Sequence, residues 1–425
     1  MLAVVFFRRE LISVLSAGRL VLALWAAYAG TAAVGALFIE SRLPWGSGSL
    51  VAGLDNALLP LATITVVGVW SRLVPVPLLL RTVSWMVVVA MALNGALAVV
   101  TSFVGFDGIP LLPRFWAAGG SGVTVAELAA GSGRYSGIFN QPAEAGVAYC
   151  LAAFCLIYLL RTGTDVSRKL WVAAWALIII GGMMTLSKVF IVGGVLISAV
   201  LILTKRPHRM LLTVSAVVTV LVTAGLGALG WLGTWGASGM LGWYVASARA
   251  GDSLAYTLSA GRFGRGGENV PPVVDKPVPT DGATGLPSEF EQPGGLVELA
   301  KEILANHPWF GLGARGAPVS YDSTWIEAIV VAGSVGALLV LAVHVVLLVR
   351  WIRLRVHLPR EQSRLAGAVV ILAWGSSFGM PSLTGNRESS LMWILLSLLV
   401  IFRIAGERDR GDLEEHDDPS GRLIR

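Results

Sequence analysis

The residues best suited to chemistry lie where a long polar segment, residues 234–323, gives way to an apolar one. The sequence HPWFGLG begins there at His307, and Asp322 follows at the end of the segment. A carboxylate can accept a proton from a hydroxyl, although at its ordinary pKa it is a weak base at neutral pH unless desolvation raises that pKa. Glu327 lies about one helical turn beyond Asp322 and is a second candidate base. We expect the chemistry of this protein to take place at this point of the chain.

A second set of candidates is cationic and lies close to the ends of apolar segments. Arginine binds phosphate oxygens through a planar fork of donors, and lysine offers a single compact charge. These residues suit a substrate that carries a diphosphate, and they are Arg134, Lys188, Arg262, Arg315 and Arg387. Neighbouring side chains complete the predicted binding set, with Glu144 as an ion-pair partner, His307 beside them, and Trp309 and Trp325 as surfaces for stacking sugars.

Apolar segments make up most of the remaining chain. Hydrophobic residues are 55% of the 425 and charged residues only 14%, beyond the range of ordinary soluble domains. About ten apolar segments are about 18 to 24 residues long, enough to cross a membrane as helices. They are residues 15–39, 50–70, 82–104, 141–160, 170–186, 189–204, 210–233, 324–349, 365–383 and 390–404. The sequence therefore predicts an all-α polytopic membrane protein.

The positions of lysine and arginine predict how this protein lies in the membrane. They gather in every second short connection, and such positively charged connections stay in the cytoplasm. Both termini are then cytoplasmic, and residues 234–323 form one large extracytoplasmic loop. We expect a multi-pass protein of the bacterial plasma membrane. The net charge of +6 lies mostly on the cytoplasmic edges, which favours contact with anionic lipids and not with nucleic acid.

The chain divides into four parts by composition. Residues 1–233 hold seven predicted helices and an outer segment at 105–140, residues 234–323 form the loop, residues 324–404 hold three helices, and residues 405–425 form a polar tail expected to be disordered. Within the loop, residues 264–295 are rich in glycine and proline and predict a mobile cover, whereas residues 294–306 predict a helix. Cys150 and Cys155 lie five residues apart in one helix and predict no disulfide. We expect neither a metal site nor a cofactor.

Two stretches resemble motifs of bacterial O-antigen ligases and O-antigen polymerases. RYSGIFNQP, from Arg134 to Pro142, resembles the run by which those proteins enter a membrane helix. Asp322-Ser323 is followed by nine residues, Gly333, two more and Gly336, which resembles the spacing after the large loop of the ligases. Thr185 to Lys188 and Ser259 to Arg262 are similar to two shorter motifs, so that the resemblance covers residues 130–345 in order.

The resemblance implies a fold like that of the GT-C glycosyltransferases and a metal-independent transfer of a glycan from undecaprenyl diphosphate to an acceptor hydroxyl. It implies that Arg134, Lys188 and Arg262 bind the diphosphate, that Asp322 acts as the base, and that Arg315 assists. The chain departs from the ligase pattern at two positions, because Asp322 replaces a histidine and Lys188 replaces an arginine. Ligase and polymerase activity both stay open. The implied partners are the lipid-linked donor, a glycan or glycolipid acceptor, membrane lipids and other glycan-assembly proteins.

Other functions compete with this one. A transporter or a flippase for lipid-linked glycans would place charges along a path through the membrane. Arg19 and Asp55, in the first two apolar segments, are the residues that favour it, and a structural pair between them is the alternative. A peptidoglycan glycosyltransferase of the elongation and division type also has about ten helices, but its outer-loop motifs are not evident in this sequence.

Overall fold

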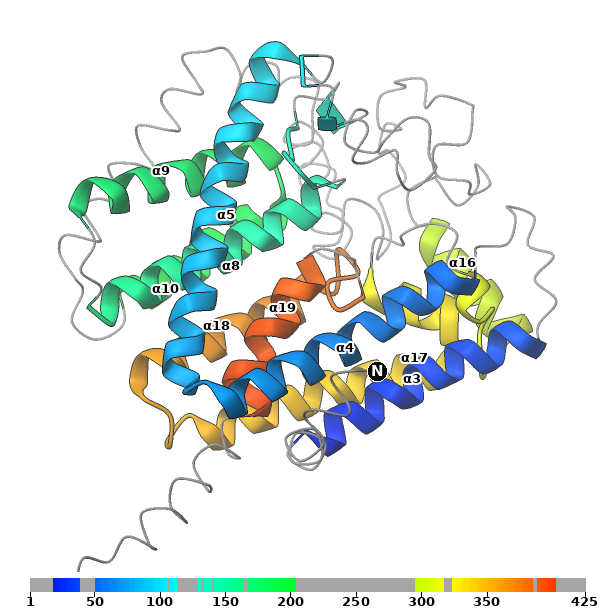
Figure 1. Cartoon of the computed structure of the whole chain (residues 1–425). Coiled ribbons are helices and arrows are strands. Elements are labelled where there is room, and N and C mark those ends of the chain that lie inside the picture. The colour runs from blue at the N-terminus through cyan, green and yellow to red at the C-terminus, as the bar shows by residue number, and fades with distance from the viewer. Residues whose placement is uncertain are drawn as a thin grey trace, which may run out of the picture.

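The computed structural model describes residues 18–38, 50–105, 108–109, 111–112, 129–130, 134–139, 141–163, 167–203, 295–316, 323–384 and 388–402. This part of the chain is helical and contains no strand (Figure 1). Six of its helices are long and apolar enough to cross a membrane. The protein is therefore a helical membrane protein, as the sequence predicts.

The six long helices are α3 (Arg19–Phe38), α4 (Leu50–Leu73), α5 (Val76–Val104), α8 (Pro142–Arg161), α9 (Arg168–Thr185) and α17 (Thr324–Leu354). The shorter elements are η1 (Val189–Val195) with α10 (Leu196–Leu203), α16 (Gly295–Asn306), η2 (Ala314–Gly316), α18 (Arg360–Ser376), and α19 (Glu388–Leu396) with η3 (Ser397–Ile401). Each predicted span coincides with one of these helices or helix pairs, except residues 210–233, which lie outside the described residues. The number of spans and the division into four parts stay predictions.

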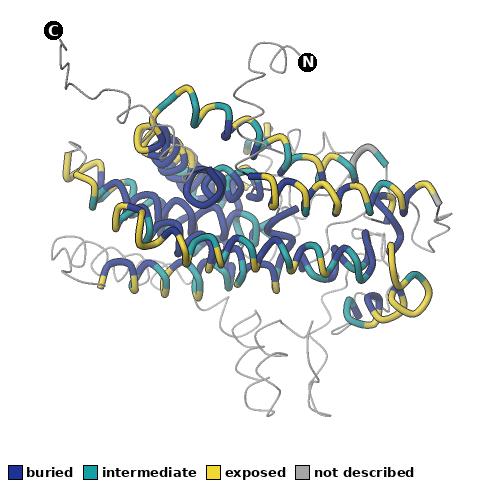
Figure 2. The backbone as a smooth tube through the Cα atoms, turned by 90° about the horizontal axis from the view of Figure 1, so that it is seen from below, coloured by how far each residue is buried: buried dark blue, intermediate teal, exposed yellow. Residues whose placement is uncertain are grey.

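Helix α8 is the central element of the bundle. Its residues from Ala145 to Leu159 are all buried, and they pack against α5, α9, η1, α18 and α19. Figure 2 shows buried segments in the middle of the bundle and exposed positions on its outside. Small side chains let neighbouring helices approach α8 closely, since lipid provides no hydrophobic drive between helices. Cys150 and Cys155 serve this packing, because both are buried and free.

The two ends of the bundle differ in composition, and we name them from that difference. Arg161 closes α8, Arg350 lies near the end of α17, and Arg364 lies in the second turn of α18, all at one end, which we call the arginine end. The opposite end, where residues 307–316 lie against α3 and α4, is called the loop end. Helix α16 lies there and matches the helix predicted at 294–306. The loop segment 264–294 and the tail 405–425 are outside the described residues.

Candidate functional site

A short non-helical segment, residues 134–139, crosses the loop end and is held by a buried asparagine of α5. The Nδ2 of Asn94 donates to the carbonyl oxygen of Ser136 at 3.1 Å and to the hydroxyl of Tyr149 at 2.9 Å. Its Oδ1 accepts from the backbone N–H of Ile138 at 2.8 Å. Because Asn94 is only 2% exposed, these bonds are made out of water and fix the segment firmly. Asn94 thus sets the position of the motif that begins at Arg134.

Arg134 is anchored on the end of α9, beside the predicted cation Lys188. The Nε of Arg134 donates to the carbonyl oxygen of Thr185 at 3.1 Å, and the N–H of Tyr135 donates to Met184 at 2.9 Å. Helix α9 ends at Thr185 because Leu186 adopts a left-handed conformation. Lys188 follows two residues after Leu186 and directly precedes η1. The structure therefore places Arg134 against the turn that leads to Lys188, which is 54 positions later in the sequence.

Glu144 lies beside the same turn. It stands in the first turn of α8, and two residues later Gly146 packs directly against the side chain of Ser187. A side chain at position 146 would collide with that hydroxyl, so glycine is what allows the start of α8 to lie beside the turn before Lys188. Arg134, Glu144 and Lys188 are each engaged in further polar interactions. Three of the predicted site residues thus form one group at the loop end.

A second group surrounds a break in α17. Ala332 and Gly333 leave the helical conformation, and Gly333 has φ 63° and ψ −156°, a combination that essentially only glycine adopts. The break frees backbone groups, and residues 308–312 bind them. Leu312 donates its N–H to Val330 at 2.7 Å, and Ser334 donates its N–H to Pro308 at 2.8 Å. The HPWFGLG motif therefore completes the hydrogen bonding of a broken helix.

The same segment is wedged between α3, α4 and α17. Gly313 lies against the backbone of Gly35 and Ala36, and Gly53 lies against Ala314. Neither Gly313 nor Gly53 has space for a β-carbon. Irregular backbone is tolerated at membrane depth only where protein surrounds it, as these contacts do. The wedge leaves His307 half-buried and Arg315 exposed, and Trp309 is 64% exposed. These three predicted residues are accessible at the loop end.

The start of α17 is fixed by the connection between α18 and α19. The hydroxyl of Ser323 donates to Ser377 at 3.2 Å, and that of Thr324 donates to Met380 at 3.0 Å. One turn later, Glu327 is 7% exposed and lies close to Thr384. Asp322 directly precedes this anchored start and lies outside the described residues. The structure thus holds the second candidate base, Glu327, in a defined buried position.

Trp325 packs inside the bundle. Its ring lies 5.0 Å from that of His344, 6.2 Å from that of Trp374 and 5.8 Å from that of Phe378, measured between centroids. Trp325 is partly buried in this aromatic cluster, whereas Trp309 is 64% exposed and open to a sugar. Stacking by either residue stays a prediction.

Arg262 and Arg387 lie outside the described residues, so their predicted roles also stay predictions.

Sequence reasoning missed two residues that position the site, Asn94 and Thr384. A signal existed for Asn94, because a lone asparagine in a long apolar helix needs partners for its amide. No comparable signal marks Thr384, which lies in a short connection and acquires its role only by folding against Glu327. Among the described residues, no cluster of three His, Cys, Asp or Glu side chains could hold a metal ion.

Comparison with known proteins adds no further assignment. No protein-family model matches the chain, and no curated protein matches it. The resemblance to O-antigen ligases and polymerases therefore stays a prediction from the motifs.

Proposed function

We propose that this protein is a bacterial glycosyltransferase of the O-antigen ligase and polymerase type. It would move a glycan from undecaprenyl diphosphate to an acceptor hydroxyl at the outer face of the plasma membrane. The observation that carries the proposal is the anchoring of Arg134 on the end of α9, at the turn that leads to Lys188. Two cations on neighbouring segments of backbone suit the two phosphates of such a donor.

The proposed orientation places the loop end outside. The arginine end holds most of the described basic residues, and positively charged connections remain in the cytoplasm. Those residues are Arg72, Arg161, Arg168, Lys169, Arg350, Arg353, Arg355, Arg360 and Arg364. Both termini would then be cytoplasmic, and the segment between α10 and α16 would form the large outer loop.

In the proposed reaction, the acceptor oxygen forms a bond to the anomeric carbon while the bond from that carbon to the diphosphate oxygen breaks. The electron pair leaves with the diphosphate, and the acceptor proton passes to a carboxylate. Asp322 would be this base, with Glu327 as the alternative. Arg134, Lys188 and Arg262 would stabilise the charge that develops on the diphosphate, and one such donor contributes about 3 kcal/mol to the transition state. No step requires a metal or a cofactor.

The remaining predicted residues would bind substrate around this centre. Arg315 and Arg387 would add positive charge, Glu144 would orient the cations, and His307 would contact the acceptor. Trp309 is the better candidate for stacking a sugar because its ring is exposed. Other glycan-assembly proteins are proposed partners, since the lipid-linked donor must be made and brought to the outer face first.

The test is transfer by the purified full chain in lipid vesicles that contain a lipid-diphosphate oligosaccharide and an acceptor glycan. We expect released lipid diphosphate and a longer glycan. Arg134→Gln or Lys188→Gln should each lower the rate about 100-fold. The control Arg353→Gln removes an exposed cation at the arginine end and should leave the rate unchanged. Equal rates in all three variants would exclude the proposed site.

A specific observation favours a second candidate, a transporter or a flippase for lipid-linked glycans. Glu327 and Glu388 are both buried in helices of the bundle, and buried ionisable groups in membranes often mark a path for substrate or protons. The residues that first suggested transport do not contribute, because Arg19 and Asp55 are both exposed and form no ion pair. The prediction that they pair is wrong, since α3 and α4 place them at different heights. Movement of a labelled lipid-linked glycan across vesicles without any transfer would favour this candidate.

A further inference from the structure

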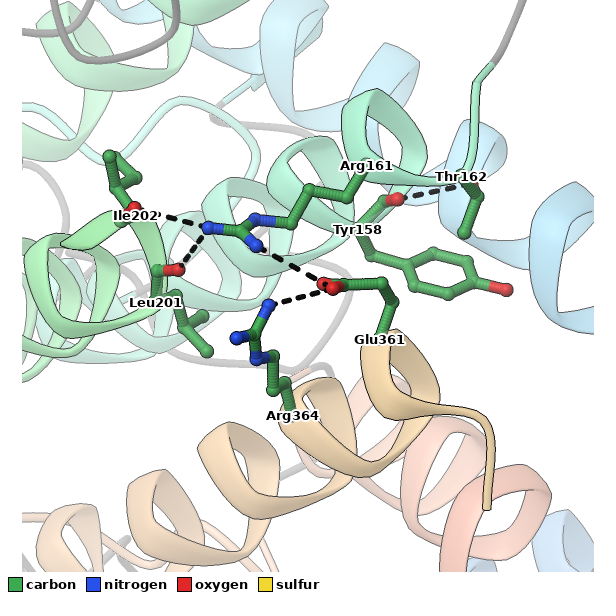
Figure 3. A network of polar contacts seen from close by, with 7 residues as sticks. All are labelled: Tyr158, Arg161, Thr162, Leu201, Ile202, Glu361 and Arg364. Atoms are coloured by element: carbon green, nitrogen blue, oxygen red, sulfur yellow. Dashed lines mark hydrogen bonds and ion pairs between the residues drawn. The ribbon is translucent and has the colours of Figure 1, made fainter. Parts of the chain in front are cut away.

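A group of charged residues at the arginine end forms a polar network that the proposed reaction does not use (Figure 3). Arg161 is the last residue of α8, and Glu361 lies in the first turn of α18. The Nη1 of Arg161 lies 3.5 Å from the Oε1 of Glu361, and the Nη1 of Arg364 lies 2.7 Å from the same oxygen. One carboxylate thus lies between two guanidinium groups from different helices.

Arg161 is built into the fold. Its Nη2 donates to the carbonyl oxygens of Leu201 at 2.7 Å and Ile202 at 3.1 Å, which belong to the last turn of α10. A cation there satisfies carbonyl groups that have no partner within their own helix. The side chain of Arg161 is only 9% exposed. Its Nε is buried and has no hydrogen-bond partner among the described residues.

Positive charge exceeds negative charge at this place. Arg360 lies next to the network and acts on Arg364 electrostatically, as does Arg161. Arg161 and Arg364 both contact the single carboxylate of Glu361, and Arg360 precedes it in the chain, so cations outnumber carboxylates among the described residues of the network. A partly buried site with excess positive charge is suited to an anion.

The network forms the rim of a small half-open pocket with an apolar wall. Phe154, Ile157, Leu201 and Leu365 line the wall, together with Tyr158 and the charged residues. The cavity volume is about 10 Å³, about the space of one water molecule, so a larger group can occupy only the mouth. Charged rim and apolar wall together match a phospholipid, whose phosphate would lie over the arginines and whose acyl chain would follow the helices.

We propose that this pocket binds the phosphodiester headgroup of an anionic phospholipid. Phosphate oxygens would accept hydrogen bonds from Arg161 and Arg364, and the acyl chain would lie against the apolar wall. Binding would tie α8, α10 and α18 together at the end opposite to the proposed active site. The inference does not depend on the proposed function.

The test measures the thermal unfolding midpoint of the full chain in uncharged detergent, with phosphatidylglycerol, phosphatidylcholine or inorganic phosphate added. We expect phosphatidylglycerol to raise the midpoint by about 2 °C or more and the other two additions to have less than half that effect. Arg364→Gln should lose most of the shift. The matched control Arg355→Gln, which removes an exposed arginine of the same end away from the pocket, should keep it.

A second variant separates lipid binding from a structural role. Glu361→Gln removes the negative charge from the rim, so the shift by phosphatidylglycerol, measured against the lipid-free variant, should grow. Equal shifts in Arg364→Gln and Arg355→Gln, or a smaller shift in Glu361→Gln, would overturn the proposal. An equal effect of inorganic phosphate on the wild type would overturn the part of it that concerns the lipid chain.

Discussion

The two ends of the bundle use polar groups in opposite ways. At the arginine end, charged side chains complete regular helices, as Arg161 does on α10 and as Arg350 does by donating to Val400 at 3.2 Å and to Ile401 at 2.9 Å. At the loop end, the backbone itself becomes irregular, with α17 broken at Gly333 and residues 308–312 bonded into the break. Buried Asn94 holds residues 134–139 there.

This difference indicates where function is to be expected. Irregular backbone inside a membrane protein costs stability and persists where it places particular groups. The loop end contains such irregular backbone and exposes Trp309 and Arg315, whereas at the arginine end Arg161 and Arg350 bind the carbonyl groups of helix ends. Four substitutions test the comparison, from the largest expected effect to the smallest.

Gly333→Ala should be the most damaging change. The alanine would have to adopt φ 63° and ψ −156°, and its β-carbon would lie 2.5 Å from the carbonyl of Trp309. We expect the free energy of unfolding to fall by about 4 kcal/mol, measured by denaturation in detergent. Gly375→Ala is the control. That glycine lies in the helix α18, and a β-carbon added there would meet no neighbouring atom within 4 Å. Similar stability of both variants would show that the break in α17 is not a rigid feature.

Asn94→Leu removes the clamp on residues 134–139. It removes the bonds that Asn94 makes to the N–H of Ile138, to the carbonyl oxygen of Ser136 and to the buried hydroxyl of Tyr149, so stability should fall by about 3 kcal/mol. Glycan transfer should be lost as well, because Arg134 is no longer positioned. Thr65→Val provides the comparison, since the hydroxyl of Thr65 bonds only within its own helix, and it should cost less than about 1 kcal/mol. A variant of Asn94 that keeps full transfer would contradict the role given to the clamp.

Arg350→Met tests the arginine end. It removes two hydrogen bonds to the end of η3 while keeping most of the apolar length, and we expect a loss of about 2 kcal/mol with transfer unaffected. The exposed Arg353 changed to Met should alter stability by less than about 0.5 kcal/mol. If thermal unfolding shows the two variants to be alike, the guanidinium of Arg350 does not stabilise the helix end.

Lys301→Ala should have the smallest effect, although Lys301 lies 2.6 Å from Glu298 at the loop end. Both side chains are about two-thirds exposed, so water and salt screen the pair, and its loss should cost at most about 0.5 kcal/mol. A larger loss in the unfolding midpoint would mean that α16 depends on this pair for its docking.

The elements of the chain could be predicted where a property of a short stretch of sequence determines its structure. Apolar length located the membrane helices, and proline and glycine located several of their ends, such as Pro142 at the start of α8. Whether Arg19 and Asp55 pair could not be predicted in this way, because the sequence does not show how far along each other's length two helices are shifted. The arrangement of Arg134 with Lys188 was expected from a resemblance, and its physical basis in Asn94 and Thr185 appeared only with the fold.

The sequence by itself determined that this is a helical membrane protein, because long runs of apolar residues have few other stable states in water or lipid. Only the tertiary structure decided that Gly311 meets Gly333, with the segment after His307 filling the break in α17. The physical reason is that backbone groups freed in one helix must find partners, and only the folded chain determines which segment provides them.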